Sequence, residues 1–170
     1  MAEGEQKESD LWSTPPEVYE ELNNRYGPFV LDAAANETNH KCPIWLGPGS
    51  EVSEDCLATL WSYSWISSGK GSRDGVVRTF LNPPYSNPAP FVAKAWWEAH
   101  WGNCMVTMLL PSTTEVGWWK EFVYDGDRRR FRPGVEVEFW PNRIRHIRPD
   151  GTRGGSPKFG SVVVTFYGGL

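Results

Sequence analysis

The tetrapeptide Asn82-Pro83-Pro84-Tyr85 combines residue types that suit the activation of a planar amine. The lone pair of such an amine is delocalised into the ring, so the nitrogen is a weak nucleophile and needs acceptors that favour a tetrahedral geometry. Asn82 offers its side-chain oxygen, and Pro83 offers a backbone carbonyl that Pro84 holds in a rigid, extended orientation. The same acceptors would stabilise the positive charge that develops on nitrogen when it attacks a methyl sulfonium. Tyr85 can stack on the flat ring.

The neighbouring elements indicate where this tetrapeptide lies. Asn and Pro are also common turn residues, so a simple strand-ending turn is the alternative interpretation. Val76 to Leu81 is β-branched and aromatic and predicts a strand that runs directly into Asn82, and residues 88–101 then predict a helix. Open α/β sheets build their sites at the carboxyl ends of strands. The position therefore favours a functional role.

The rest of the pattern predicts one α/β domain over residues 11–170, preceded by a flexible tail at 1–10. Strands and helices alternate in the way that is typical of a mostly parallel sheet covered on both faces. The further predicted elements are a helix of about three turns ending before Gly27-Pro28, strands at 29–32 and 104–110, a helix at 114–124, and strands at 135–140, 144–148 and 161–167. We expect 36–75 to be mostly loop and the last strand pair to be antiparallel.

Charge is distributed unevenly along the chain, although the formal net charge is only −4. Residues 1–60 carry twelve acidic and three basic residues, whereas residues 128–170 carry nine basic and three acidic residues. A basic segment on an acidic protein favours a DNA partner, although the run at 128–130 alone would be read as a solvated turn. The candidate DNA contacts are Arg143, Arg145, Arg153 and Lys158, around a glycine-rich loop at 149–157 that we expect to be mobile.

Several kinds of protein are disfavoured by the composition. No stretch approaches the roughly 20 apolar residues of a membrane span, and the acidic start is unlike a signal peptide, so we expect a soluble, cytoplasmic protein without a membrane partner. The three cysteines are widely spaced, which disfavours both a disulfide framework and a metal site. A monomer and a homodimer are both compatible with the sequence.

A series of segments follows in a fixed order along the chain between Leu11 and Gly168. They are Leu11-Trp12-Ser13-Thr14-Pro15-Pro16-Glu17, Leu31-Asp32-Ala33-Ala34-Ala35, Asn39-His40-Lys41-Cys42, Asp55-Cys56-Leu57-Ala58 with Trp61, Leu81 to Ser86, Leu109 to Thr114 with Trp118 and Trp119, Arg143-Ile144-Arg145, and Ser156 to Ser161. Taken together they resemble the small phage-type, Dam-like family of DNA N6-adenine methyltransferases.

This resemblance implies a Rossmann-like fold that depends on S-adenosylmethionine, with a mostly parallel sheet and a C-terminal antiparallel hairpin. It implies transfer of a methyl group to N6 of an adenine flipped out of DNA, by direct displacement and without a metal. The implied catalytic residues are Asn82, Pro83, Pro84 and Tyr85. The implied cofactor contacts are Trp12, Thr14, Pro15, Asp32, Ala33, Asp55 and Asn82.

Each implied cofactor contact has a physical role and an alternative. Thr14 and Pro15 would lie near the methionine carboxylate, and Asp32 would accept from the ammonium, unless it is a turn acid. Asp55 would hold the ribose hydroxyls, unless it is a surface acid, and Trp12 would pack on the adenosine, unless it belongs to the core.

Two segments depart from the family pattern. Residues 36–38 stand where most such enzymes have a glycine-rich loop, and residues 142–146 differ from the usual hairpin sequence. The pairs of glycines at 47–50 and 69–72 are interpreted as loops.

Three other functions stay open on the residues alone. Cytosine N4 presents the same exocyclic amine, and protein-glutamine methylation uses the same tetrapeptide on an amide nitrogen. The basic segment argues against the protein substrate, and it would also serve a DNA-binding module without enzymatic activity. If the chain is encoded by a phage or prophage, the location would be the host cytoplasm.

Overall fold

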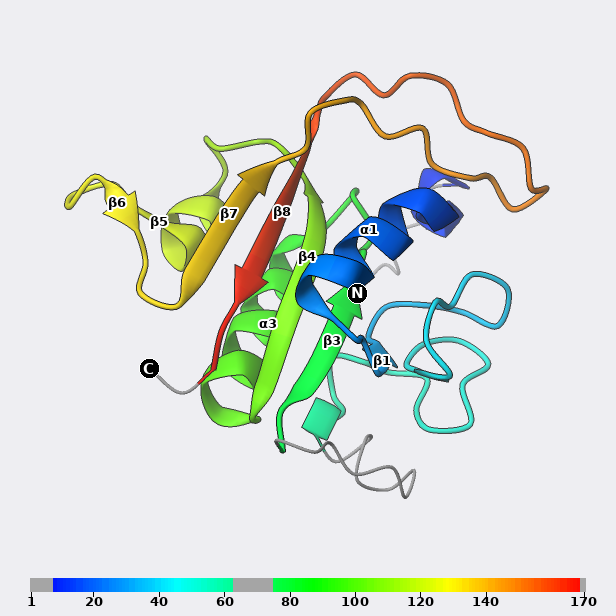
Figure 1. Cartoon of the computed structure of the whole chain (residues 1–170), viewed down its shortest axis with the longest axis horizontal. Helices are drawn as coiled ribbons and strands as arrows, with labels where there is room; N and C mark the ends of the chain where they lie inside the picture. The colour runs from blue at the N-terminus through cyan, green and yellow to red at the C-terminus, as the bar shows by residue number, and fades with distance from the viewer. Residues whose placement is uncertain (1–7, 63–74, 169–170) are drawn as a thin grey trace, which may run out of the picture.

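A six-stranded sheet runs through the centre of the computed structural model, which describes residues 8–62 and 75–168. The strand order is β2-β1-β3-β4-β8-β7 (Figure 1). The bounds of these strands are Leu31–Asp32 (β1), Ile44–Trp45 (β2), Val77–Leu81 (β3), Cys104–Pro111 (β4), Val135–Phe139 (β7) and Ser161–Phe166 (β8). Strands β2, β1, β3 and β4 are parallel, while β8 is antiparallel to both β4 and β7. The predicted α/β class, with its mostly parallel sheet and antiparallel C-terminal pair, is confirmed.

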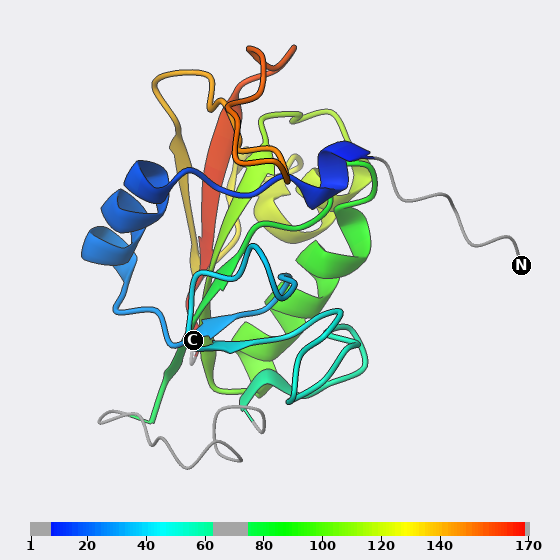
Figure 2. The same cartoon turned by 90° about the vertical axis from the view of Figure 1, so that its right-hand side faces the viewer.

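Helices cover both faces of the sheet, as Figure 2 shows. Helix α1 (Pro16–Tyr26) packs on one face through Val18, Leu22 and Tyr26, the three positions that the sequence places on one side of the helix. Helix α3 (Ala89–Trp101) and the short π-type helix η2 (Trp119–Val123) cover the other face. A short 3₁₀ turn, η1 (Glu8–Leu11), precedes α1. Strands β5 (Tyr124–Asp125) and β6 (Arg130–Phe131) form a separate two-stranded antiparallel hairpin.

Strand alternation explains the two cores. Phe80 and Leu109 point toward α1, whereas Leu81, Met108 and Leu110 point toward α3, because successive side chains of a strand face opposite sides. Strands that are buried on both faces consist of continuous runs of apolar residues, which is why β4 and β8 are recognisable in the sequence.

Two predicted elements differ from the structure. The helix expected at 114–124 begins only at residue 117, where two α-helical residues lead into η2 (Trp119–Val123), and its last expected residue starts strand β5 instead. The strand expected at 144–148 is absent from the described chain. Only Ile147 forms bridges there, one to Ser13 and one to Arg153, because the chain turns back between Arg148 and Thr152 before a longer ladder can form.

Residues 36–62 are mostly loop, as expected, apart from the two-residue strand β2. The tail predicted at 1–10 lies outside the described residues up to residue 7, and residues 8–10 belong to η1. The loop predicted at 69–72 also lies outside them. All three cysteines fall within the described ranges and are buried thiols without a disulfide. Within 8–62 and 75–168, no helix has the length and apolarity to cross a membrane.

Candidate active site

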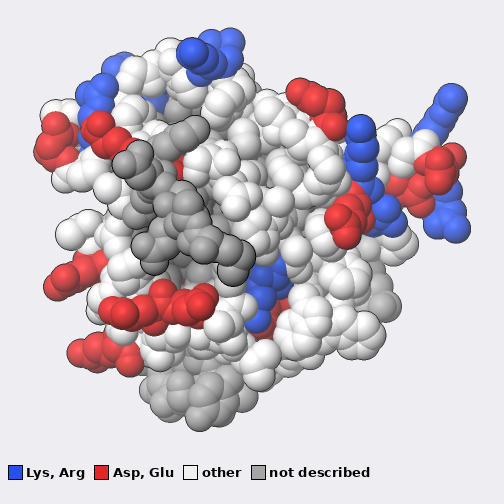
Figure 3. All heavy atoms as spheres, turned by 180° about the vertical axis from the view of Figure 1, so that it is seen from behind, with Lys and Arg blue, Asp and Glu red and all other residues white. Residues whose placement is uncertain are grey.

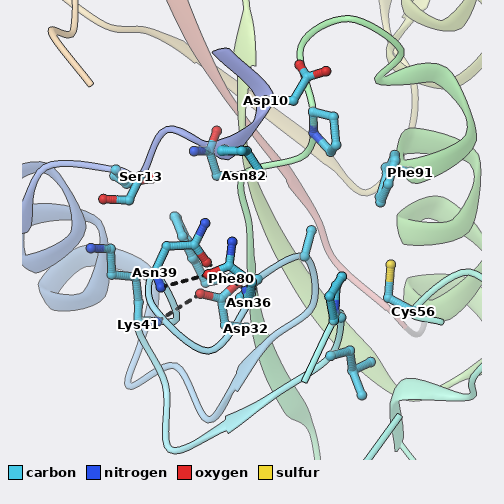
Figure 4. Close-up of a pocket in the computed structure, with 18 of the residues that line it drawn as sticks. Asp10, Ser13, Asp32, Asn36, Asn39, Lys41, Cys56, Phe80, Asn82 and Phe91 are labelled. Carbon is cyan, nitrogen blue, oxygen red and sulfur yellow. Dashed lines mark hydrogen bonds between the residues drawn. The ribbon is translucent and has the colours of Figure 1, made fainter. Parts of the chain in front are cut away.

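The carboxyl ends of β1 and β3 bring Asp32 and Asn82 together. Asp32 is the last residue of β1 and lies opposite Phe80 in the parallel register, so Asn82, two residues further along, passes directly beside it. A cavity of about 370 Å³ opens at this edge of the sheet (Figure 4). This volume is within the usual range of small-molecule sites.

The cavity is lined by residues from four separate parts of the chain. The segment 10–14 crosses one side, the loops after β1 and β2 form another, and Asn82 and Pro84 form a third. Phe91 projects from α3 toward the remaining side (Figure 4). Polar groups and apolar surface therefore alternate around the wall, which fits a ligand that carries both charged and aromatic parts.

Asp32 is the buried acid of the cavity. One of its carboxylate oxygens, Oδ2, accepts a hydrogen bond of 2.9 Å from the Lys41 backbone N–H. Burial raises the pKa of Asp32 to about 6, and backbone hydrogen bonds from Lys41 and Ala34 oppose that rise. A cation bound in the cavity would remove the desolvation penalty of this carboxylate.

Four buried polar atoms around the cavity have no hydrogen-bond partner within the described ranges. They are Trp12 Nε1, Thr14 Oγ1, Asp32 Oδ1 and Asn82 Oδ1. Buried polar atoms are nearly always paired, and leaving one unpaired costs about 1–3 kcal/mol. A cluster of four beside one cavity is typical of a binding site whose partners are supplied by a ligand.

An asparagine turn replaces the missing glycine-rich loop after β1. The Asn36 side-chain oxygen accepts from the backbone N–H groups of Thr38 and Asn39, and the Asn39 side-chain oxygen accepts from the Asn36 N–H. The loop 47–50, interpreted from the sequence as a loop only, also reaches the cavity. Gly47 has φ +138°, and a Cβ there would collide with the Ala35 carbonyl, so only glycine permits this close approach.

The tetrapeptide at 82–85 separates two environments. Asn82 and Pro84 line the cavity, whereas the Tyr85 ring points elsewhere, packing edge-on against His146 and tilted against Phe159 with centroid distances of 5.5 and 6.2 Å. Burial raises the pKa of the Tyr85 phenol and lowers that of His146 to about 4, so both side chains are neutral at neutral pH. His146 Nε2 is also buried, and the described chain supplies no partner for it.

The structure gathers most of the residues that the resemblance implied. Trp12, Thr14, Asp32, Asp55, Asn82 and Pro84 line the cavity. Pro15, Ala33 and Pro83 are buried behind it, and Pro15 accepts the first backbone hydrogen bonds of α1. Asp55 is exposed, and its Oδ1 accepts from the Leu57 and Ala58 N–H groups, so it also stabilises a local turn.

Sequence reasoning missed several wall residues. Asn39 and Lys41 belong to a segment that was matched to the family but given no role, and Phe91 is recognisable only as a helix residue. Asp10 was assigned to the tail, yet it lines the cavity. No local pattern marks these positions, because their proximity depends on how the loops fold over the sheet edge.

The basic candidates gather on the loop between β7 and β8, which Figure 1 shows extending beyond the sheet above α1. Arg143, Arg145, Arg153 and Lys158 are all exposed. Arg143 and Arg145 donate to the carbonyls of Pro157 and Gly154, and Arg153 forms an ion pair of 2.6 Å with Glu17 of α1.

The tip of this loop is more structured than the glycine-rich sequence predicts. Arg148 and Gly154 donate backbone hydrogen bonds to Thr152 and His146, and Gly154 packs closely on the Trp12 ring. The tip of the loop thus forms a hydrogen-bonded turn, and its mobility stays a prediction.

Acidic and basic side chains are unevenly spread over the face that Figure 3 shows. Several acidic side chains lie at the left of this face, while at the right acidic and basic side chains lie next to one another, and basic side chains also lie along the upper edge. The loops after β1 and β2 carry the exposed acidic residues Glu37, Glu51, Glu54 and Asp55, whereas the β7–β8 loop carries the exposed basic candidates.

Comparison with known proteins agrees with this arrangement. The model of the family described as DNA N-6-adenine-methyltransferase (Dam) matches residues 2–159. The chain belongs to this family. The DNA N-6-adenine-methyltransferase of Escherichia phage T1 is 38% identical over 112 residues, which cover 66% of this chain and 40% of that protein. The protein of the same name from Haemophilus phage HP1 is 31% identical over 127 residues, covering 69% of this chain and 62% of that protein.

Membership in the Dam family is consistent with the Rossmann-like fold and implies use of a methyl donor. The matched region includes the tetrapeptide, Asp32 and the residues of the cavity wall. The aligned parts span 40% of the phage T1 protein and 62% of the phage HP1 protein, so both relatives contain regions that have no counterpart in the alignment.

Proposed function

We propose that this protein transfers a methyl group from S-adenosylmethionine to the N6 amine of an adenine flipped out of DNA. The observation that carries the proposal is the Asn82 side-chain oxygen, a buried acceptor without a partner in the described chain, beside a cavity that ends at the carboxylate of Asp32. Family membership supports the same reaction.

The cavity wall fits the methyl donor group by group. The free Oδ1 of Asp32 would accept from the ammonium of the amino acid part, and Thr14 Oγ1 would donate to its carboxylate. Lys41 lines the same wall, and its half-buried ammonium would add a charge opposite that carboxylate. Trp12 and Phe91 supply aromatic surface for the adenosine, and Asp55 has its second oxygen available for the ribose.

The chain's own residues would act on the nitrogen that receives the methyl group. When bound, S-adenosylmethionine supplies an electrophilic methyl group on a sulfonium. Asn82 Oδ1 and the Pro83 carbonyl would accept the two protons of the exocyclic amine and pull its lone pair out of conjugation. As the nitrogen becomes positive, these preorganised dipoles stabilise it and require no reorganisation. The nitrogen then releases its extra proton to an acceptor or to water.

The ring of the adenine that receives the methyl group would lie on the Tyr85 side of the tetrapeptide, and its N6 amine would reach Asn82 at the edge of the donor cavity. Tyr85, His146 and Phe159 form an aromatic group there, and all three rings are uncharged when His146 is neutral. A base stacked in a duplex cannot reach the sheet edge, so flipping follows from the depth of the site. The exposed arginines of the β7–β8 loop supply positive charge for the phosphates beside it.

The deciding experiment identifies the methylated nucleoside. Purified protein is incubated with duplex DNA and S-adenosylmethionine, the DNA is digested to nucleosides, and the products are separated and weighed. N6-methyladenosine (as the deoxynucleoside) is expected. Detection of N4-methylcytosine instead would show that cytosine is the substrate. If the protein binds DNA but no methylated nucleoside is found, a DNA-binding module without enzymatic activity would be favoured.

A further inference from the structure

Asp10 lies far from the tetrapeptide in sequence but contacts it directly in space. Its Oδ2 accepts a hydrogen bond of 2.5 Å from the Ser86 hydroxyl, and its Oδ1 accepts one of 3.2 Å from the Ser86 backbone N–H. Ser86 immediately follows Tyr85, so the two hydrogen bonds end on the catalytic turn itself. We call this pair the Asp10–Ser86 clasp.

The clasp closes one side of the donor cavity. Figure 4 shows Asp10 and Asn82 on the same side of the cavity, with Asp32 across from them. The segment 10–14 lines the cavity along its whole length, and it is held at two points. The clasp fixes one end, and Ser13 fixes the other by exchanging two backbone hydrogen bonds of 2.8 and 2.9 Å with Ile147.

The segment 10–14, which is held at Asp10 and at Ser13, carries two unpartnered groups at the cavity. Trp12 Nε1 and Thr14 Oγ1 are buried, and no described residue pairs with them. The Trp12 ring is itself enclosed by the Arg148 guanidinium at 5.3 Å and by the close approach of Gly154. A segment that is fixed at both ends and presents polar atoms inward is suited to hold a ligand against the sheet edge.

We propose that Asp10 is a positioning residue, which holds the catalytic turn at a fixed distance from the methyl donor through its two hydrogen bonds to Ser86. The inference rests on the proposed function, because it concerns the same reaction. Asp10 touches neither reacting atom, and it acts through the orientation of Asn82 and Pro84. Misplacing a catalytic acceptor by about 1 Å can cost up to about 100-fold in rate, so a contact of this kind has a measurable effect on turnover.

The structure offers a matched control for Asp10. Asp125 accepts the same combination of donors from Arg128, a backbone N–H at 3.0 Å and a side-chain N–H at 3.2 Å, but it lies on β5, outside the cavity. Asp10→Asn and Asp125→Asn therefore make the same chemical change at two aspartates, each of which accepts one backbone and one side-chain hydrogen bond. Ser86→Ala removes the hydroxyl from the other side of the clasp, and Ser86→Thr retains it.

The first measurement does not depend on activity. Hydrogen exchange of the full-length protein, followed by mass spectrometry, reports protection of the backbone amides of Asn82, Tyr85, Ser86 and Asn87, since Pro83 and Pro84 carry no amide hydrogen. Asp10→Asn should accelerate exchange there, whereas Asp125→Asn should not. Unchanged exchange in Asp10→Asn would overturn the clasp, whatever the enzyme turns out to methylate.

The second measurement tests positioning in steady-state turnover with DNA and S-adenosylmethionine. Asp10→Asn and Ser86→Ala should each lower kcat about tenfold with little change in the KM for DNA. The double variant should be no slower than the slower single variant, because both remove one contact. Ser86→Thr should retain most of the activity of the parent.

The outcomes separate the two hypotheses. A parent protein that methylates no DNA would count against the proposed function, and the exchange measurement would still decide whether the clasp exists. An active parent whose kcat is unchanged in Asp10→Asn and Ser86→Ala would overturn the positioning role. Additive losses in the double variant would do the same, since they would show two independent effects.

Discussion

The two polar regions of this protein differ in how their hydrogen bonds are satisfied. Where α1 packs against β7, every polar group of a small network has a partner. The Tyr26 hydroxyl donates to Glu136 at 2.9 Å and contacts Glu138 at 3.3 Å, Arg25 pairs with Glu138 at 2.5 Å, and Tyr167 donates to Glu136 at 2.8 Å. At the carboxyl edge of the sheet, Thr14, Asp32 and Asn82 each have a buried oxygen without a described partner.

This difference indicates which polar residues serve the fold and which serve the ligand. A satisfied network contributes to stability and gains nothing from a ligand. An unsatisfied one lowers stability and recovers the loss only when a ligand supplies the missing partners. Substitutions in the two regions should therefore affect different measurements.

The largest effect is expected from Asn82→Ala. This change removes an acceptor that acts mainly in the transition state, so turnover should fall by roughly 100- to 1000-fold, equivalent to about 2–4 kcal/mol. Cofactor binding and thermal stability should change little. Asn87→Ala, a neighbouring exposed asparagine, is the control. Near-parental turnover in Asn82→Ala would refute the proposed role of the acceptor.

The next effect concerns the binding of S-adenosylmethionine by Asp32. The carboxylate must be ionised to pair with an ammonium, and its pKa in the ligand-free protein is raised to about 6. Affinity measured by calorimetry should therefore increase from pH 5 to about pH 7 and then level off. Asp32→Asn should bind at least about tenfold more weakly and lose most of this dependence.

Ionisation of Asp32, which favours cofactor binding, should lower the stability of the ligand-free protein. Because its folded-state pKa of about 6 exceeds the ordinary value of 3.8 for an aspartate, the folded protein holds this proton more tightly than the unfolded chain. Its contribution to the free energy of unfolding is thus greatest below pH 4 and is lost as the pH rises through 6. Without ligand, Asp32→Asn should be more stable than the parent at pH 8 by roughly 1–3 kcal/mol. Chemical denaturation at pH 5 and pH 8 measures this difference, and a variant less stable at both values would contradict it.

Tyr26→Phe should have a smaller effect, a loss of stability with no change in cofactor affinity or turnover. The change removes the hydroxyl that donates to Glu136, so the free energy of unfolding should fall by about 1 kcal/mol. Cofactor affinity and turnover should stay at the level of the parent. Thermal melting together with calorimetry tests both halves of this prediction. A loss of cofactor affinity would mean that the two polar regions are coupled.

The smallest effects are expected from single arginines of the β7–β8 loop. Alanine at Arg143 or Arg145 should weaken DNA binding on all sequences and reduce the salt slope by about one unit each. Arg153→Ala should weaken discrimination at one base pair, and Arg128→Ala in the β5–β6 hairpin is the control. A filter-binding salt titration measures the slopes. If the three loop variants all match the parent, the DNA surface lies elsewhere.

The sequence predicted the elements that depend on local patterns. Helix α1 has an apolar face and a clear end at Gly27, and strands β3, β4 and β8 are runs of apolar residues. Asp32 and Asn82 each end or follow such a strand, so their meeting at one sheet edge follows from parallel pairing. The family resemblance supplied the roles of the cofactor contacts, and the cavity brings together most of those residues.

Only the tertiary structure decided which side chains meet across the loops. The contact of Asp10 with Ser86, the position of Lys41 in the cavity wall and the packing of Tyr85 against His146 all join segments that no local period relates. The β7–β8 loop reads as flexible because glycine and proline carry no packing signal, yet its turn is held by hydrogen bonds to Ser13 and by the Trp12 ring. Local patterns determine where a strand ends, whereas the folding of loops over that end depends on contacts between residues distant in the chain.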